Sequence, residues 1–127
     1  MRWDSLKICK GADILKGLII KPSWAELILS GEKTIEVRGS KTNIRGEIGI
    51  IESGSKKVFG TIELFHCAEL TESNFELWGD RHKLDISYEE LLKIYPKPYA
   101  WCLKEVKRYD DPVPYEHKRG CVVWVNL

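Results

Sequence analysis

The chain has 127 residues, of which 43% are hydrophobic and 31% charged, as expected for one ordinary globular domain that buries a core without metals or disulfides. Its formal net charge of +1 argues against a protein that coats nucleic acid generally. Cys9, Cys67, Cys102 and Cys121 are widely spaced, so we expect them to be reduced. With no signal peptide or long apolar run, we expect a cytoplasmic protein without a membrane span.

Charge is distributed unevenly along the chain. Residues 33–57 contain six Lys or Arg and three Glu, a balance of +3. Residues 69–90 contain two basic and seven acidic residues, a balance of −5. This asymmetry predicts a basic side that suits a polyanion and an acidic side elsewhere.

The first elements of the chain are an N-terminal segment and a short strand. Residues 1–16 lack a clear period, and we expect them to form a short N-terminal helix or an arm laid over the core, followed by one domain over residues 17–127. Leu18, Ile19 and Ile20 form an apolar run that stops at a Lys-Pro pair, which predicts a buried strand.

A helix is predicted to follow this strand. Ser23 and Glu26 have capping-box spacing, and apolar residues recur between positions 24 and 28. Gly31 supplies the left-handed stop. On this interpretation Trp24 faces the core.

A charged strand is predicted directly after this helix, with Lys33 at its entrance. Alternation puts Ile35 and Val37 in the core and puts Thr34, Glu36 and Arg38 together on the other face. If that face lines a cleft, Lys33, Glu36 and Arg38 form a compact hydrogen-bonding set. The alternative is a solvated strand face.

The middle of the chain predicts a polar loop and a hairpin. Lys41 and Arg45 lie in the loop, where they either reach an anion or are solvated. Residues 47–52 and 58–67 read as paired strands. The glycines inside these strands, at positions 49 and 60, favour the bends of a small barrel over a flat sheet.

The acidic region 71–94 predicts two helices. Thr71 caps the first, and Ser87 with Glu90 forms a capping box for the second. His82 lies in the loop between them, and we expect it on the surface because no further metal ligand stands at a suitable spacing.

The remaining residues predict two more strands. Residues 99–106 alternate, with Tyr99, Trp101 and Leu103 on one face and Ala100, Cys102 and Val106 on the other. Residues 110–114 read as a turn because they hold two prolines, and residues 121–125 read as a closing strand. The whole set predicts an α+β, mainly β domain: a small, partly open barrel of about six strands flanked by two or three short helices.

The stretch from Gly31 to Arg38 resembles the G-x-K-x-x-E-x-R motif of the ASCH (ASC-1 homology) domain family, which has a PUA-like barrel. The resemblance extends over residues 17–127. It implies a cleft where Lys33, Glu36 and Arg38 meet, and binding of RNA or a modified nucleotide there.

If the protein recognises RNA or a nucleotide, its polar and aromatic candidates are ligand-binding residues. Lys33 and Arg38 would hold a phosphate or a base edge, and Glu36 would accept a hydrogen bond from a base amino group. The full set of candidates is Lys33, Glu36, Arg38, Lys41, Arg45, Tyr99, Trp101, His117 and Arg119. No metal site or cofactor is predicted, and the oligomeric state stays open.

Three other functions remain open. Similar small amidohydrolases act on N4-acetylcytidine, and Lys33 matches their lysine, but their threonine position is Glu36 here and their downstream glutamate has no clear equivalent near Leu84 and Asp85. We also expect Glu36 to keep Lys33 charged. Metal-assisted RNA cleavage would use Glu36 and His117. The fourth possibility is a protein-interaction module that uses the acidic region. If the protein is an enzyme, Lys33 and Glu36 are the catalytic candidates.

Overall fold

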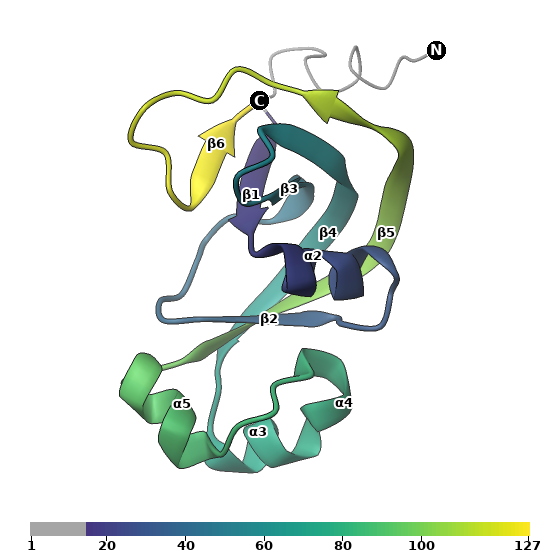
Figure 1. Cartoon of the computed structure of the whole chain (residues 1–127). Helices are drawn as coiled ribbons and strands as arrows, with labels where there is room; N and C mark the ends of the chain where they lie inside the picture. Colours follow the sequence, from purple (N-terminus) through teal and green to yellow (C-terminus); the bar gives the residue numbers. More distant parts are fainter. Residues whose placement is uncertain (1–14) are drawn as a thin grey trace.

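A six-stranded sheet, curled into a half-barrel, forms the frame of the computed structural model, which describes residues 15–127 (Figure 1). Its elements in chain order are β1 (Lys16–Ile20), α2 (Pro22–Leu29), β2 (Ile35–Arg38), β3 (Gly46–Glu52), β4 (Lys57–Glu69), α3 (Glu72–Leu77), α4 (Gly79–His82), α5 (Tyr88–Ile94), β5 (Tyr99–Pro114) and β6 (Trp124–Asn126). The predicted N-terminal arm lies outside the described residues, apart from its last two positions. Lys16, which we assigned to it, is the first residue of β1.

The strand order in the sheet is β2-β5-β4-β3-β1-β6. β3 and β4 form the predicted antiparallel hairpin, and β1 pairs with β3 in parallel. β2 and β6 are the edge strands, paired with β5 and β1 respectively. This arrangement confirms the α+β, mainly β barrel class.

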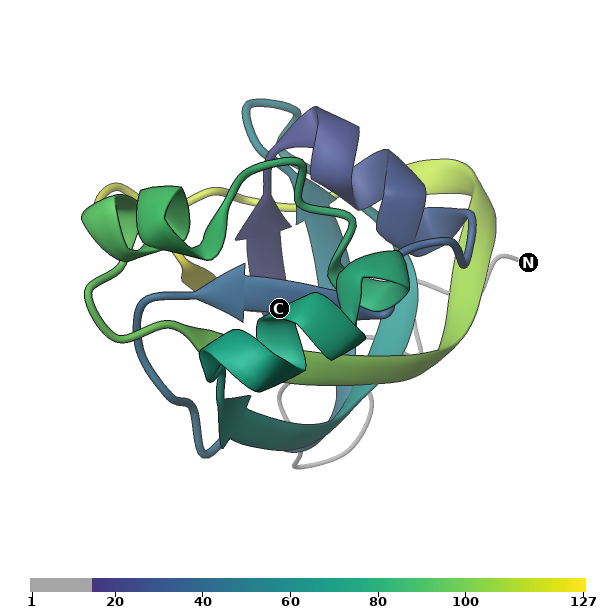
Figure 2. The same cartoon turned by 90° about the horizontal axis from the view of Figure 1, so that it is seen from below.

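The helices are grouped around β2. α2 lies on one side of this strand and α3, α4 and α5 lie on the other, as Figure 1 shows and as Figure 2 shows from the helical end. Ile35 and Val37 of β2 pack with Phe75 of α3 and Leu91 of α5 in one buried cluster. The prediction that Ile35 and Val37 lie in the core is therefore confirmed.

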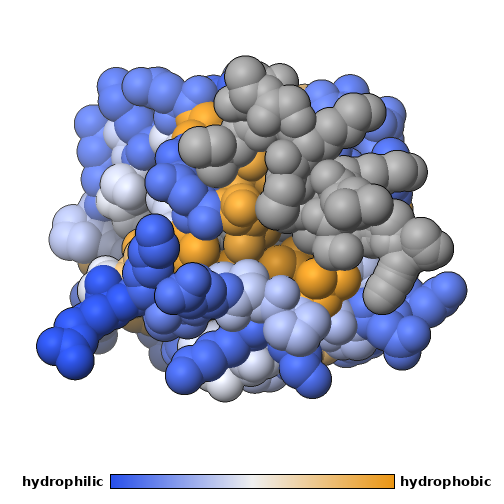
Figure 3. All heavy atoms as spheres, turned by 90° about the horizontal axis from the view of Figure 1, so that it is seen from above, coloured by the Kyte–Doolittle hydropathy of each residue, from blue (hydrophilic) through white to orange (hydrophobic). Residues whose placement is uncertain are grey.

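The main core lies between α2 and the inside of the curled sheet. It contains Leu18, Ile20, Ile28, Ile50, Leu64, Trp101 and Leu103, among others. On the face seen from above, apolar side chains gather in the middle and hydrophilic ones lie around the part that is coloured (Figure 3).

No helix within residues 15–127 is long and apolar enough to cross a bilayer. Cys67, Cys102 and Cys121 are free thiols, whereas Cys9 lies outside the described residues.

Irregular pairing between β4 and β5 bends the sheet. Gly60 sits so close to β5 that a side chain there would overlap the carbonyl of Lys107, which explains the predicted glycine bend. The register also shifts between Thr61 and Glu63, and Glu105 opposite this shift has a positive φ of 57°. This bulge places Val106 against the main core, so the prediction that it shares a face with Ala100 and Cys102 was wrong.

The start of α2 differs from the predicted capping box. The N-cap is Lys21, whose side chain makes no capping bond, and Pro22 occupies the first turn. The carboxylate of Glu26 instead accepts two hydrogen bonds from the Arg108 guanidinium, at 3.0 and 2.7 Å. The predicted stop is confirmed, because Gly31 has a φ of 87°.

The acidic region contains three helices rather than two. Thr71 caps α3 by accepting from the backbone N–H of Asn74 at 3.2 Å. Ser87 and Glu90 form the predicted capping box of α5. The expected loop between them is wrong in part, because residues 79–82 form the single helical turn α4, whose C-cap Lys83 has a φ of 62°.

The predicted turn at residues 110–114 is also wrong, because β5 continues through it. Val113 pairs with Val58 and Pro114 with Lys57. Among residues 15–127, β2 pairs only with residues 99–102 of β5, so the prolines at 112 and 114 interrupt no β2–β5 hydrogen bonds. The closing strand is shorter than expected and starts at Trp124 instead of Cys121.

Candidate functional site

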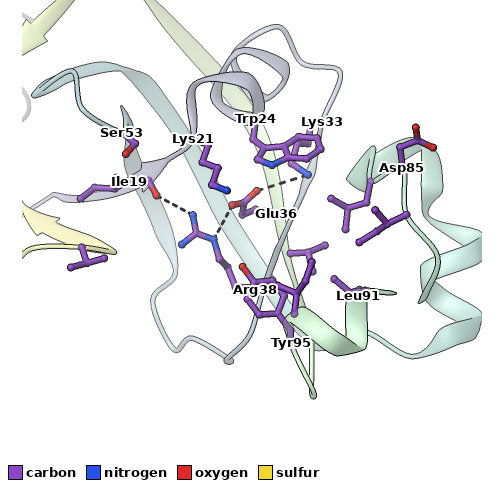
Figure 4. Close-up of a pocket in the computed structure, with 15 residues that line it drawn as sticks. Ile19, Lys21, Trp24, Lys33, Glu36, Arg38, Ser53, Asp85, Leu91 and Tyr95 are labelled. Carbon is purple, nitrogen blue, oxygen red and sulfur yellow. Dashed lines mark hydrogen bonds and ion pairs between the residues drawn. The ribbon is translucent and has the colours of Figure 1, made fainter. Parts of the chain in front are cut away.

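A pocket of about 460 Å³ opens between α2, β2 and the segment 84–95 (Figure 4). Its polar lining comes from Lys21, Lys33, Glu36, Arg38, Ser53 and Asp85. Its apolar lining comes from Ile19, Trp24, Val37, Leu84, Ile86, Leu91, Ile94, Tyr95 and Val122. The three charged residues singled out by the motif are therefore brought together in one cavity.

Lys33 is almost completely buried, with 1% of its surface exposed. The turn that ends α2 delivers it to the pocket, and its backbone N–H donates to the carbonyl of Leu27 at 2.9 Å. Its ammonium donates to the backbone carbonyl of His82 and lies 4.5 Å from the centre of the Trp24 ring. Two independent parts of the fold thus fix the position of this ammonium group.

Burial lowers the pKa of Lys33 to about 8 from its ordinary value of 10.5. The nearby Glu36 carboxylate raises this pKa and the Arg38 guanidinium lowers it, both more weakly than burial. Glu36 therefore favours the charged form of Lys33, as expected, but burial outweighs this effect and leaves the pKa below its ordinary value. At pH 7, below this pKa, Lys33 stays mainly protonated, and its neutral amine becomes accessible at mildly alkaline pH.

Glu36 and Arg38 form a close ion pair beside Lys33. The Nε of Arg38 donates to Oε2 of Glu36 at 2.8 Å, and its Nη2 donates to the Ile19 carbonyl at 3.0 Å. The other carboxylate oxygen, Oε1, lies 3.8 Å from the Lys33 ammonium, beyond hydrogen-bonding distance. This oxygen and the remaining guanidinium N–H groups keep hydrogen-bonding capacity that faces the pocket.

His82 is buried, with 1% of its surface exposed, so its predicted surface position was wrong. The backbone N–H of Leu84 donates to its Nδ1 at 3.0 Å, which leaves Nε2 as the protonated nitrogen that donates to the Phe75 carbonyl at 2.8 Å. The imidazole also stacks on the Phe75 ring at 4.5 Å between centres. Because the carbonyl of His82 accepts from Lys33, this neutral ring helps to hold the buried lysine in place.

We expect His82 to make the fold sensitive to acid. Burial lowers its pKa below the ordinary value of 6.5. The unfolded chain then binds a proton more readily, so the stability present above pH 6.5 is lost as the pH falls toward the folded-state pKa. Lys33 and Glu76 are the charged groups that also act on this ring, the first lowering and the second raising its pKa.

Urea unfolding of the wild type and of His82→Gln at pH 7 and pH 5 measures this effect. The wild type should lose more stability on acidification than the variant, whatever their difference at pH 7. An equal loss in both proteins would contradict a neutral buried His82.

The six remaining candidates from the sequence lie outside the pocket lining. Lys41 and Arg45 are exposed, and the Arg45 guanidinium donates to the carbonyls of Thr42 and Ile44, each at 2.8 Å. Arg119 lies in an exposed turn. The Tyr115 hydroxyl and Nδ1 of His117 are hydrogen-bonded at 2.8 Å.

The two aromatic candidates belong to the core side of β5. Trp101 is 2% exposed, stacks on Trp124 and donates from Nε1 to the Ser40 carbonyl at 2.9 Å. Tyr99 packs against the main core. The aromatic ring beside Lys33 is instead that of Trp24, so the prediction that Trp24 only faces the core missed its place in the pocket lining.

The carboxylates and imidazoles do not converge on a metal site. Within residues 15–127, no group of three or more His, Cys, Asp or Glu side chains is arranged to hold a metal ion. Glu36 lines the pocket and His117 does not.

Comparisons with known proteins identify the domain. The ASCH domain family model matches residues 18–113. Crystal structures of the ASCH protein of Zymomonas mobilis are similar in fold: the unmodified protein has a TM-score of 0.61 at 20% identity and covers 78% of this chain and 72% of its own. A Ser-to-Ala variant of it has a TM-score of 0.64 at 18% identity, with coverages of 88% and 87%. A search of curated proteins finds no significant match. The match over most of the chain shows that this protein belongs to the ASCH domain family.

Proposed function

We propose that the protein binds a nucleotide, free or as a unit of RNA, with the base held in the pocket beside Lys33, Glu36 and Arg38. The observation that carries this proposal is the buried network of these three residues, which opens onto a cavity of about 460 Å³. Cavities of roughly 300 to 1,000 Å³ with a few convergent polar groups are typical of small-molecule sites. The family resemblance supports the same ligand class.

The chemistry of the network suits a base edge. Bases present donors and acceptors side by side, and specific proteins match them with donors and acceptors at equal spacing. Oε1 of Glu36 is free to accept from an exocyclic amino group, and the Lys33 ammonium, which donates to the His82 carbonyl, has a further N–H for a carbonyl or ring nitrogen. The Trp24 ring offers a stacking surface in the same cavity.

The burial of the network also supports a binding role. Removing Lys33 and Glu36 from water costs free energy, which their 3.8 Å ion pair offsets only in part. Apolar residues of similar volume would usually stabilise a fold as well or better. Charges kept in such a place are more consistent with a ligand than with stability.

Direct binding measurements test the proposal. The wild-type protein is titrated with the four ribonucleosides, their monophosphates and a mixed-sequence single-stranded RNA, while Trp fluorescence and heat are recorded. We expect saturable binding of at least one mononucleotide, because a cavity of about 460 Å³ is in the size range of sites for single small molecules. Binding of none of these compounds would contradict the proposal, and RNA binding without salt dependence would favour a contact that does not involve phosphate.

Hydrolysis of an acylated base amine is the second candidate, favoured by the pKa of about 8 at Lys33. The neutral amine can take a proton from water as the water oxygen attacks the acyl carbonyl; the acyl C–N bond then breaks and the departing amine accepts a proton. Two features differ from the amidohydrolase pattern. Glu36 stands at the threonine position, and Asp85, exposed at the pocket rim, is the carboxylate nearest in sequence to the downstream glutamate.

Incubation with N4-acetylcytidine, followed by mass spectrometry for cytidine and acetate, tests this second candidate. Turnover should rise between pH 7 and pH 9 as Lys33 loses its proton. A pH-independent rate over this range would exclude Lys33 as the base, and tight binding without turnover would leave recognition as the function.

A further inference from the structure

We infer that one end of the pocket is a phosphate subsite formed by Lys21, Arg38 and Ser53. This inference rests on the proposed nucleotide binding and adds where the phosphate lies. The subsite would take a phosphate ester attached to the nucleoside, either the terminal group of a mononucleotide or an internal group of RNA.

Three separate segments meet at this end of the pocket. Lys21 is at the junction of β1 and α2, Arg38 ends β2, and Ser53 begins the turn after β3. In Figure 4 the Lys21 ammonium points toward Glu36 and Arg38, and Ser53 lies at the same side of the pocket. The end of β1 ties them together, because Ser53 N–H donates to the Ile20 carbonyl at 2.8 Å and Arg38 donates to the Ile19 carbonyl at 3.0 Å.

The hydrogen-bonding groups at this end are not used up within the described residues. The Lys21 ammonium makes no hydrogen bond or ion pair in residues 15–127, and the Ser53 hydroxyl has no partner in the same part of the chain. Arg38 donates two of its five N–H groups, one to the Glu36 carboxylate and one to the Ile19 carbonyl. Together they offer an ammonium, a guanidinium edge and a hydroxyl, which are the donors that phosphate oxygens accept from most strongly.

The charged side chains at this end of the pocket favour an anionic ligand. Lys21, Lys33 and Arg38 are cationic and Glu36 lies beside them, whereas the other lining carboxylate, Asp85, belongs to the segment 84–95 on the far side of the pocket. The first turn of α2 beside Lys21 carries no acidic residue. Two cationic side chains that approach each other repel, and an anion between them turns this repulsion into attraction.

The opposite end of the pocket sets the orientation of the ligand. Leu84, Ile86, Leu91 and Ile94 line it with aliphatic groups, and the one charged residue of this segment in the lining, Asp85, is an acid that repels phosphate. A nucleotide therefore has its phosphate between Lys21 and Arg38 and its base toward Lys33 and Trp24. The same orientation leaves the aliphatic end for an apolar part of the base or its substituent.

The test compares nucleosides with their phosphates on two matched variants. Lys21→Gln removes the unpaired cation from an exposed position whose side chain makes no capping bond. Lys93→Gln removes an exposed lysine of α5 that does not line the pocket, and serves as the control. Each protein is titrated with the ribonucleosides, their 5′- and 3′-monophosphates, a dinucleotide and inorganic phosphate.

We expect the wild type to bind one monophosphate about tenfold more tightly than the parent nucleoside. Lys21→Gln should remove roughly three- to tenfold of this preference and leave the nucleoside Kd within about twofold. Lys93→Gln should match the wild type. Ser53→Ala, with Lys21 intact, should also lower the preference for the monophosphate over the nucleoside. Tighter binding of the dinucleotide than of either monophosphate would assign the subsite to an internal phosphate of RNA, and the reverse order to a terminal one.

Equal affinities for nucleoside and monophosphate in the wild type would overturn the subsite while leaving nucleotide binding intact. So would a Lys21→Gln variant that weakens nucleoside and monophosphate alike. Binding of neither compound class would overturn the proposed function and the subsite together.

Discussion

Replacing Glu36 by Gln should abolish most ligand binding while the protein stays folded. The carboxylate is the acceptor that faces a base amino group, and the amide that replaces it has lost the charge that strengthens this bond. Loss of a charged partner in a buried contact costs about 2 to 5 kcal/mol, or roughly thirtyfold or more in Kd.

The fold should tolerate this change because each neighbour of Glu36 keeps another way to be satisfied. Glu36 raises the pKa of Lys33, so without it the buried amine, whose pKa is already about 8, releases its proton at little cost. The carbonyl oxygen of the substituted amide still accepts from Nε of Arg38, which also keeps its 3.0 Å bond to the Ile19 carbonyl. We expect the stability to fall by about 1 to 2 kcal/mol, against roughly 3 to 5 kcal/mol for a buried charge left without a partner.

Thermal melts and nucleotide titrations on the same samples decide between these outcomes. Glu32→Gln is the matched control, because Glu32 is exposed in the turn just before Lys33. A Glu36→Gln protein that unfolds would show that the network is structural. Full binding with a normal melting temperature would show that the network takes no part in recognition.

Lys33→Met should change how stability depends on pH. The folded-state pKa of Lys33 is about 8 and its ordinary value is 10.5, so between these values the unfolded chain holds more protons. Wild-type stability should therefore rise from pH 8 to pH 10.5, by about 3 kcal/mol from this residue. Methionine has no proton to release, so the variant lacks this rise and is more stable than the wild type at pH 7, at the expense of binding.

Denaturant unfolding at pH 7.5, 9 and 10 compares the two proteins. The difference in stability between Lys33→Met and the wild type should shrink as the pH rises. Comparing the two proteins cancels the titration of the groups that they share. A constant difference across this range would mean that Lys33 titrates normally.

Local rules predicted the parts of this fold whose contacts are close in sequence. The Thr71 cap, the Ser87 and Glu90 capping box and the Gly31 stop each depend on neighbours within a turn of helix, and all are present. The Ser23 and Glu26 pattern failed because Glu26 bonds to Arg108, a residue 82 positions away. Such a competitor is not visible to a local rule.

The errors at the end of β5 and at His82 have the same origin. Prolines predict a turn only if their missing N–H groups would break a ladder, and within residues 15–127 β2 does not pair with residues 110–114 of β5. His82 is polar and lies next to a glycine-initiated turn, so nothing nearby predicts burial. Phe75 and His82 lie on the separate helices α3 and α4, so their stacking follows from the turn at Trp78 and could not be read from helical spacing.

The residues of the candidate site also form two groups, those close together in the sequence and those that only the fold brings together. Lys33, Glu36 and Arg38 are close in sequence and share a motif, so the sequence alone brought them together. Trp24 and Ser53 reach the pocket from α2 and from the turn after β3, and only the curl of the sheet joins these segments to β2. Pocket residues contributed by distant segments need the tertiary structure.

Backbone and Trp-indole NMR shifts, followed while a binding nucleotide is added, test the central claim most directly. We predict that the largest changes fall on Lys33, Glu36, Arg38 and the Trp24 indole, and that they saturate together. Changes confined to the loop with Lys41 and Arg45, or to the region around His117, would contradict a ligand site in the pocket.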